Sequence, residues 1–448
     1  MRFFFVLALL LVFPFASIAK EPIGTNIQLS DNTLDNGVRV VVIPDRRAPV
    51  VTHMIWYKVG SADDPVGKSG AAHFLEHLLF KGTRNVPAGE FSEAVAAIGG
   101  QENAFTSHDY TAYYQKVSPG ALRQMMEYEA DRMRNVVVSD EFVLPERKVI
   151  LEERSSRVDN NPSSILSEFT QRALYVHHPY GIPVIGWEHE IAKLERTDVL
   201  EFYEKWYQPW NAIVVVAGDI EPDMVLKNAE ETYGKIKATS PKIERERLAD
   251  PKPVAAKRLE YSDQRVTNPV FRRLYSAPSY NQAAELEGEA LDLLATILGD
   301  SVSSRIYKNV VLEQELATSA GAFYQGSSRD TGYFGIYATP RGENSLETVV
   351  AAIQREIYAI LENGVTQEEL DRARDSYLQS LIFSQDSQVT LARIFGSILA
   401  GGGTIEDFTG WPERLNRVSI DDVKKAAQSY LNNQTAVTSY LLPLEDNQ

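Results

Sequence analysis

Residues 73–83 read HFLEHLLFKGT, and their apolar spacing predicts a helix that Gly82 brings to an end. His73 and His77 are four residues apart, so their imidazoles project from one helix face, which Glu76 shares. Apolar residues between them would bury the opposite side. Zinc in hydrolases commonly takes two histidines and a carboxylate and keeps a fourth position for water. The stretch therefore predicts a zinc site in which Glu76 acts as the base.

The third ligand has to come from another segment. Residues 139–157 predict a helix that carries four glutamates: Glu141, Glu146, Glu152 and Glu153. Glu146 and Glu153 are seven residues apart and share a face, which the neighbouring apolar residues turn towards the interior. Carboxylates on such a face require a cation or a hydrogen-bond donor. Glu152 points about 100° away, so helix geometry favours Glu153 without excluding Glu152.

The composition limits the partners and the ligand types. With 448 residues, the chain is too long for one ordinary core, and two or more domains are expected. A net charge of -16 argues against a nucleic-acid partner, because phosphate binding requires a basic surface. Cysteine is absent, so a metal site has to be built from histidine, aspartate and glutamate.

The first residues have the pattern of a secretory signal. Met1-Arg2 is a positive start, Phe3 to Phe15 is apolar apart from one proline, and Ser17-Ile18-Ala19 offers small residues for cleavage. We expect residues 1–19 to be removed and the mature chain to be periplasmic or secreted. The apolar run is shorter than the roughly 20 residues that a bilayer span requires. An uncleaved anchor is the alternative, but no stable membrane span is expected.

The remainder of the chain has the pattern of two α+β halves, residues 20–238 and 258–448. Between them, residues 239–257 are rich in proline, lysine and glutamate, which predicts an exposed linker. In the first half, Asn36-Gly37 predicts a hairpin turn and residues 212–217 (AIVVVA) predict a buried strand. We therefore expect mostly antiparallel sheets flanked by helices.

A weak internal repeat relates the two halves. When Gly82 is set against Gly299, the second half places apolar residues at the positions of the zinc motif. Ala290, Leu293 and Leu294 then stand opposite His73, Glu76 and His77. The second half is therefore expected to keep the fold and lose the metal site.

Several motifs occur together with HFLEHLLFKGT. They are GG at 99–100, NAFT at 103–106, DYT at 109–111, VILEERSSRVDNN at 149–161, HPYGIPVIG at 178–186 and AGD at 217–219. This set closely resembles the pitrilysin, or insulinase, family of zinc peptidases, whose motif is the inverted His-x-x-Glu-His. The nearest branch is the one that contains mitochondrial processing peptidase and its bacterial relatives. The resemblance covers nearly the whole mature chain.

The resemblance implies a fold and a site. Glu153 would be the third ligand of one Zn²⁺ per chain, and Glu146 would support the ligands from behind. The residues that match the substrate strand are Asn103, Ala104, Phe105 and Thr106, where a peptide would add as a further strand. The two halves would form half of a clam-shell chamber that admits short or unfolded polypeptides.

One departure from the family concerns the second half. Active members carry an arginine and a tyrosine there that stabilise the oxyanion of the substrate, and these positions fall on Val311 and Thr318. A heterodimer is one explanation, in which a homologous chain supplies both residues. Alternatively, Tyr324 or Tyr333 substitutes, and the enzyme is a homodimer or a monomer.

The function that these features predict is that of a secreted zinc metalloendopeptidase. Glu76 would deprotonate the attacking water and pass the proton to the leaving amine. A non-catalytic subunit that binds peptides or serves as a structural part is the alternative, although such relatives usually lose the zinc residues. A zinc hydrolase for substrates other than peptides is a further alternative, because zinc chemistry alone does not select peptides.

Overall fold

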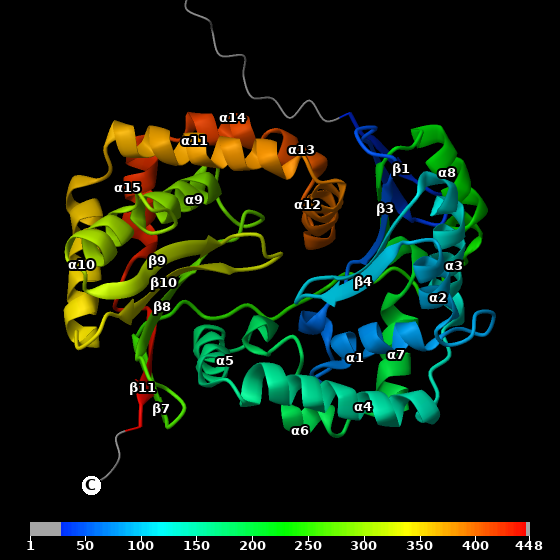
Figure 1. Cartoon of the computed structure of the whole chain (residues 1–448), viewed down its shortest axis with the longest axis horizontal. Helices are drawn as coiled ribbons and strands as arrows, with labels where there is room; N and C mark the ends of the chain where they lie inside the picture. The colour runs from blue at the N-terminus through cyan, green and yellow to red at the C-terminus, as the bar shows by residue number, and fades with distance from the viewer. Residues whose placement is uncertain (1–27, 445–448) are drawn as a thin grey trace, which may run out of the picture.

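The structure, a computed structural model, describes residues 28–444 and consists of two α+β halves lying side by side (Figure 1). Each half contains one sheet with helices packed on both faces. The predicted fold class is therefore confirmed. The expected signal segment, residues 1–19, lies outside the described residues.

The N-terminal sheet has six strands in the order β1-β2-β6-β3-β5-β4. Their bounds are β1 (Ser30–Thr33), β2 (Arg39–Pro44), β3 (Val51–Tyr57), β4 (Gln101–Thr106), β5 (Thr111–Val117) and β6 (Ala212–Gly218). The hairpin predicted at Asn36-Gly37 joins β1 to β2. Both β3 and β6 are buried along their whole length, as expected for β-branched and aromatic runs covered on both faces. The edge strand is β4.

The C-terminal sheet repeats this arrangement without β1. Its strands are β7 (Lys257–Asp263), β8 (Val270–Ala277), β9 (Ala317–Gln325), β10 (Gly332–Pro340) and β11 (Val437–Pro443), in the order β7-β11-β8-β10-β9. In each sheet one pair is parallel, β2 with β6 and β7 with β11, and the other pairs are antiparallel. The same order and directions in both sheets agree with the internal repeat.

Helices of the N-terminal half pack on one face of its own sheet and on one another. Their bounds are α1 (Ala71–Leu78), α2 (Glu90–Ala97), α3 (Leu122–Asn135), α4 (Asp140–Arg154), α5 (Pro162–Leu174), α6 (Glu188–Ile191), α7 (Arg196–Trp206) and α8 (Pro222–Glu231). The apolar face of α1 is fully buried through Phe74, Leu75 and Leu78. This burial fixes the direction in which the opposite face of α1 points.

The later part of the chain contributes the remaining helices. They are α9 (Glu287–Leu298), α10 (Leu346–Asn363), α11 (Gln367–Ser384), α12 (Gln388–Gly401), α13 (Ile405–Thr409), α14 (Trp411–Arg417) and α15 (Ile420–Tyr430). The helix α9 follows β8 as α1 follows β3, and it is buried along nearly its whole length. Within residues 28–444, no helix combines the length and the apolar character that crossing a bilayer requires.

The two halves exchange a helix. From the C-terminal half, α12 crosses to the N-terminal sheet and packs on β3 and β6, where Phe395 and Leu399 join an apolar cluster with Trp56 (Figure 1). From the N-terminal half, α5 packs on β11, β7 and β8, and its Ser167 accepts a hydrogen bond of 2.6 Å from Arg272. Each sheet thus has a face that is covered only when the other half is present.

The segment between the halves is largely exposed, as expected, but one of its side chains is buried between the halves. Residues 236–256 form neither helix nor strand, but the side chain of Arg247 is only 5% exposed. It pairs with Asp63 and Asp109 of the N-terminal half and with Asp330 of the C-terminal half. The prediction of exposure holds for most of the segment, but carboxylates from both halves surround the side chain of Arg247 and bury it. Through Arg247, the segment therefore links the two halves to each other.

At Gly396, α12 packs directly on Trp56 of the N-terminal sheet, since an added Cβ would overlap the ring of Trp56. We predict that Gly396→Ala destabilises the chain by about 1–3 kcal/mol through overpacking. Alanine would otherwise favour the helix by about 1 kcal/mol. The measurement is the denaturant midpoint of unfolding.

Gly401 at the end of α12 provides the matched control. The nearest atom to its added Cβ is 4.0 Å away, so Gly401→Ala should leave the midpoint unchanged or raise it. Equal midpoints for the two variants would show that contact with Trp56 does not limit the packing of α12.

Candidate active site

The helix α1 begins at a position that requires glycine. Gly70 has φ 90°, and a Cβ there would lie 2.6 Å from the carbonyl oxygen of Ile185. Asp64 accepts hydrogen bonds from the backbone N–H groups of Gly70 (2.7 Å) and Ala72 (2.8 Å). Burial raises the pKa of Asp64 well above its usual value, and these N–H groups oppose that shift. The start of α1 is thus held by one buried carboxyl group that the sequence pattern did not reveal.

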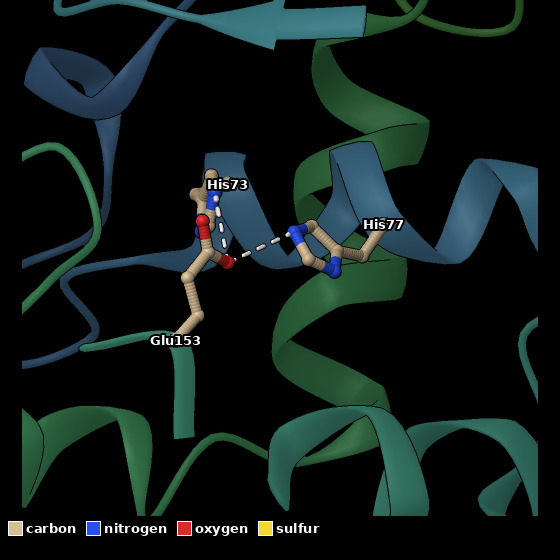
Figure 2. A group of neighbouring side chains, drawn as sticks. All are labelled: His73, His77 and Glu153. Atoms are coloured by element: carbon tan, nitrogen blue, oxygen red, sulfur yellow. Dashed lines mark ion pairs between the residues drawn. The ribbon is translucent and has the colours of Figure 1, made fainter. Parts of the chain in front are cut away.

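Three side chains meet where α1 lies against α4 (Figure 2). One carboxylate oxygen of Glu153, Oε2, is 3.4 Å from Nε2 of His77 and 3.8 Å from Nε2 of His73. One ligand atom from each residue lies within 4.8 Å of the others. Glu152, the alternative left open by helix geometry, is exposed to solvent. The structure therefore brings Glu153, rather than Glu152, to the histidines.

Two further contacts orient this cluster. Glu146 Oε1 is 2.9 Å from His77 Nδ1, so a proton on Nδ1 is held there and the lone pair of Nε2 faces Glu153. Lys81 binds the other oxygen of Glu146 at 2.7 Å. Arg157 binds Glu153 Oε1 at 2.6 Å and leaves Oε2 directed at the histidines. Sequence reasoning anticipated the position of Glu146 but not the two cations.

The electrostatic environment suits metal binding. Burial, with smaller contributions from His77 and Arg157, lowers the pKa of His73 to about 3, so its imidazole is neutral at ordinary pH. Neither nitrogen of this ring has a hydrogen-bond partner: Nδ1 is buried and unpaired, and Nε2 stands 3.8 Å from Glu153. Two imidazoles and a carboxylate are a fitting set for zinc. A metal ion bound between His73 Nε2 and Glu153 would supply the partner that this nitrogen lacks.

Glu76 lies on the same face of α1 and has a separate partner. The hydroxyl group of Thr106 on β4 donates a hydrogen bond to Glu76 Oε2. Burial raises the pKa of Glu76, and the hydrogen bond from Thr106 opposes this shift. A raised pKa makes a carboxylate a better proton acceptor near neutral pH.

The predicted substrate strand is β4, which contains Asn103, Ala104, Phe105 and Thr106. It pairs with β5 on one side, and no strand within residues 28–444 pairs with its outer edge. The side chain of Phe105 points away from α1, contacts Trp56 at a centroid distance of 5.2 Å and lies under Arg393 of α12. At Phe105, a peptide could therefore bind only to main-chain groups.

The structure also shows the surroundings of the residues at which the sequence departs from the family pattern, and of the two tyrosines considered as substitutes. Val311 is 3% exposed in the core, and the Thr318 hydroxyl donates to Thr339 O at 3.2 Å. Tyr324 donates its hydroxyl to Pro278 O at 2.6 Å. Tyr333 packs on a small apolar cluster of the N-terminal half. The side chains at the two aligned positions offer no cation or phenol.

Comparison with known proteins gives a consistent result. The family model "Insulinase (Peptidase family M16)" matches residues 39–187, and "Peptidase M16 inactive domain" matches residues 193–377. The zinc protease PqqE of Helicobacter pylori is 31% identical over 92% of this chain and 92% of its own length. A probable mitochondrial-processing peptidase subunit beta of Arabidopsis thaliana is 25% identical over 92% of this chain and 78% of its own.

Solved structures show the same fold. A crystal structure of a protease from Helicobacter pylori has a TM-score of 0.87 at 29% identity and covers 93% of this chain and 100% of its own. The periplasmic protease PqqL of Escherichia coli has a TM-score of 0.80 at 20% identity. The match covers 94% of this chain but 48% of PqqL, so the chain spans about half of that protein.

The arrangement at α4 predicts different outcomes for two neighbouring glutamates. Glu153→Gln should lower zinc affinity at least tenfold, because it removes the carboxylate charge beside both histidines. Glu152→Gln, on the exposed side of the same turn, should bind zinc as the unaltered chain does. Zinc content after dialysis against a graded chelator measures both. Equal loss in the two variants would contradict the assignment of Glu153.

Proposed function

The chain belongs to the insulinase (M16) family of zinc proteases, and we propose that it is a zinc metalloendopeptidase acting on short or unfolded peptides. The observation that carries the proposal is the cluster of His73, His77 and Glu153, with Glu76 on the same face and bonded to the edge strand β4. Ligands, base and substrate strand thus meet at one place in the N-terminal half.

Zinc held by the three side chains would supply a Lewis acid that polarises a peptide carbonyl and lowers the pKa of a water molecule. The remaining steps belong to Glu76. Its carboxylate accepts a proton from the attacking water and transfers that proton to the amine that leaves. Thr106 holds one oxygen of Glu76, so the free oxygen is the one that exchanges protons.

The outer edge of β4 explains how a peptide would be positioned. Its unpaired N–H and C=O groups can pair with an extended chain, and main-chain pairing makes little demand on sequence. Thr106 belongs to this strand and also binds the base, so a peptide added at the edge would lie in register with Glu76. Short or unfolded peptides have an accessible extended main chain, whereas most of the main chain of a folded protein is already paired, which favours short or unfolded substrates.

A partner chain completes the proposal. Val311 and Thr318 cannot stabilise an oxyanion, and the chain spans about half of PqqL. We therefore favour a heterodimer with a homologous chain that carries the missing arginine and tyrosine, ahead of a homodimer. The proposed halves remain residues 20–238 and 258–448, and removal of residues 1–19 with export to the periplasm or beyond remains part of the proposal.

The role of the base can be tested with Glu76→Gln. The variant should keep its zinc, because all three ligands remain, and should lose about 10²–10⁴-fold in turnover, the usual contribution of a general base. Zinc content and cleavage of a fluorogenic unfolded peptide measure the two effects. Retained turnover in a zinc-loaded variant would contradict the role of Glu76.

The split active site can be tested by mixing chains. The purified mature chain alone should bind zinc but cleave peptides poorly, and addition of a homologous chain with the arginine and tyrosine should restore cleavage. Full activity of this chain alone would contradict the heterodimer. Zinc without activity in both samples would favour the non-catalytic peptide binder instead.

A further inference from the structure

A second cavity lies in the C-terminal half, apart from the metal cluster. Its volume is about 570 Å³, and it opens between α9, α11, α12, α14 and the loop before α9. In Figure 1 these helices lie in the upper left and upper middle of the view. The volume falls in the range of small-ligand sites. The residues of its wall decide what such a ligand would be.

One carboxyl group in the wall has no cationic partner. Asp292 of α9 accepts hydrogen bonds from the hydroxyl of Tyr280 and, at 3.1 Å, from that of Tyr377. Within residues 28–444, no lysine, arginine or histidine pairs with it. The neighbouring Glu289 differs, since Arg414 binds it at 2.7 Å. Burial raises the pKa of Asp292 to about 7, which reflects the cost of a charge without a counter-ion.

Three aromatic side chains lie at this end of the cavity, and the hydroxyl groups of two of them donate to the carboxyl group. Trp411 donates to the hydroxyl of Tyr280 at 3.0 Å, and the rings of Tyr377 and Trp411 meet edge to face at 5.6 Å. Gly288 makes room for Tyr280, because a Cβ there would lie 2.8 Å from its ring. Aromatic faces next to a carboxylate attract cations, and most strongly ammonium groups that have left water. The polar end of the cavity is thus built for a cation.

The remaining wall combines apolar side chains with serines and charged groups such as Glu289, which Arg414 neutralises. Leu381, Ile398 and Phe408 line the cavity beside the aromatic rings, and the first and last are largely buried. These apolar side chains can accommodate the hydrocarbon part of a ligand. The carboxyl group with its aromatic neighbours and the apolar side chains together fit a molecule that is cationic at one end and apolar at the other.

We propose that this cavity binds a protonated amine carried on an apolar body, with Asp292 as its counter-ion and the three rings around its ammonium group. The amino terminus of an apolar peptide, a lysine side chain and a small alkylamine share this chemistry. The site is separate from the zinc cluster, so it stands or falls independently of the proposed peptidase activity.

The probe is hexylammonium, titrated calorimetrically into the purified chain at pH 8, with 1-hexanol as the neutral comparison. Hexylammonium should bind at least tenfold more tightly than hexanol, and Asp292→Asn should reduce its affinity at least tenfold. Glu76→Gln should bind it unchanged. Absence of binding at millimolar hexylammonium, equal affinity for hexanol, or unchanged affinity in Asp292→Asn would each overturn the proposal.

A second variant covers the case in which Asp292→Asn fails to fold. Ser380 is exposed on α11 at the wall of the cavity, and Ser380→Trp should fill the opening and abolish binding without touching Asp292. Unchanged affinity in a folded Ser380→Trp would overturn the assignment to this cavity. A tripeptide with a free amino terminus, its acetylated form and an acetylated lysine amide then distinguish the three sources of the amine.

Discussion

Neither half of this chain covers both faces of its own sheet, and that constraint governs the rest of the structure. The helix α12 covers β3 and β6 from the other half, and α5 covers β11, β7 and β8 in return. Between them, Arg247 binds carboxylates from both halves in a place from which water is largely excluded, where removing one partner costs far more than at the surface. The metal cluster and the edge strand β4 keep their geometry because this exchange holds the N-terminal sheet in place from behind.

Local spacing made part of the site predictable from sequence. His73, Glu76 and His77 lie within five residues, so helix periodicity alone places them on one face, and strands such as β6 are evident as β-branched runs. Helix geometry favoured Glu153 without excluding Glu152, and the family resemblance then pointed to Glu153. Contacts made across long separations left no local signal, as with the cap that Asp64 provides for α1. The composition of the linker correctly indicates exposure for most of it, but the burial of Arg247 left no local signal, because its partners are more than a hundred residues away or in the next half.

The two halves share a fold but differ at the positions of the zinc motif. In α9, the positions opposite the zinc motif are Ala290, Leu293 and Leu294, which are at most 1% exposed and have become core. The polar residues of that helix, Glu289 and Asp292, face a different direction and line the second cavity. That cavity could not be anticipated from the sequence, because Tyr280, Tyr377 and Trp411 come together only through the tertiary fold.

The helix exchange also sets an order of events during synthesis. The N-terminal sheet is complete when β6 ends at Gly218, yet its second face stays bare until α12 has been made, up to Gly401. A nascent chain therefore carries an uncovered apolar sheet through the synthesis of nearly two hundred further residues. The second face of the N-terminal sheet can be covered only after α12 has been synthesised.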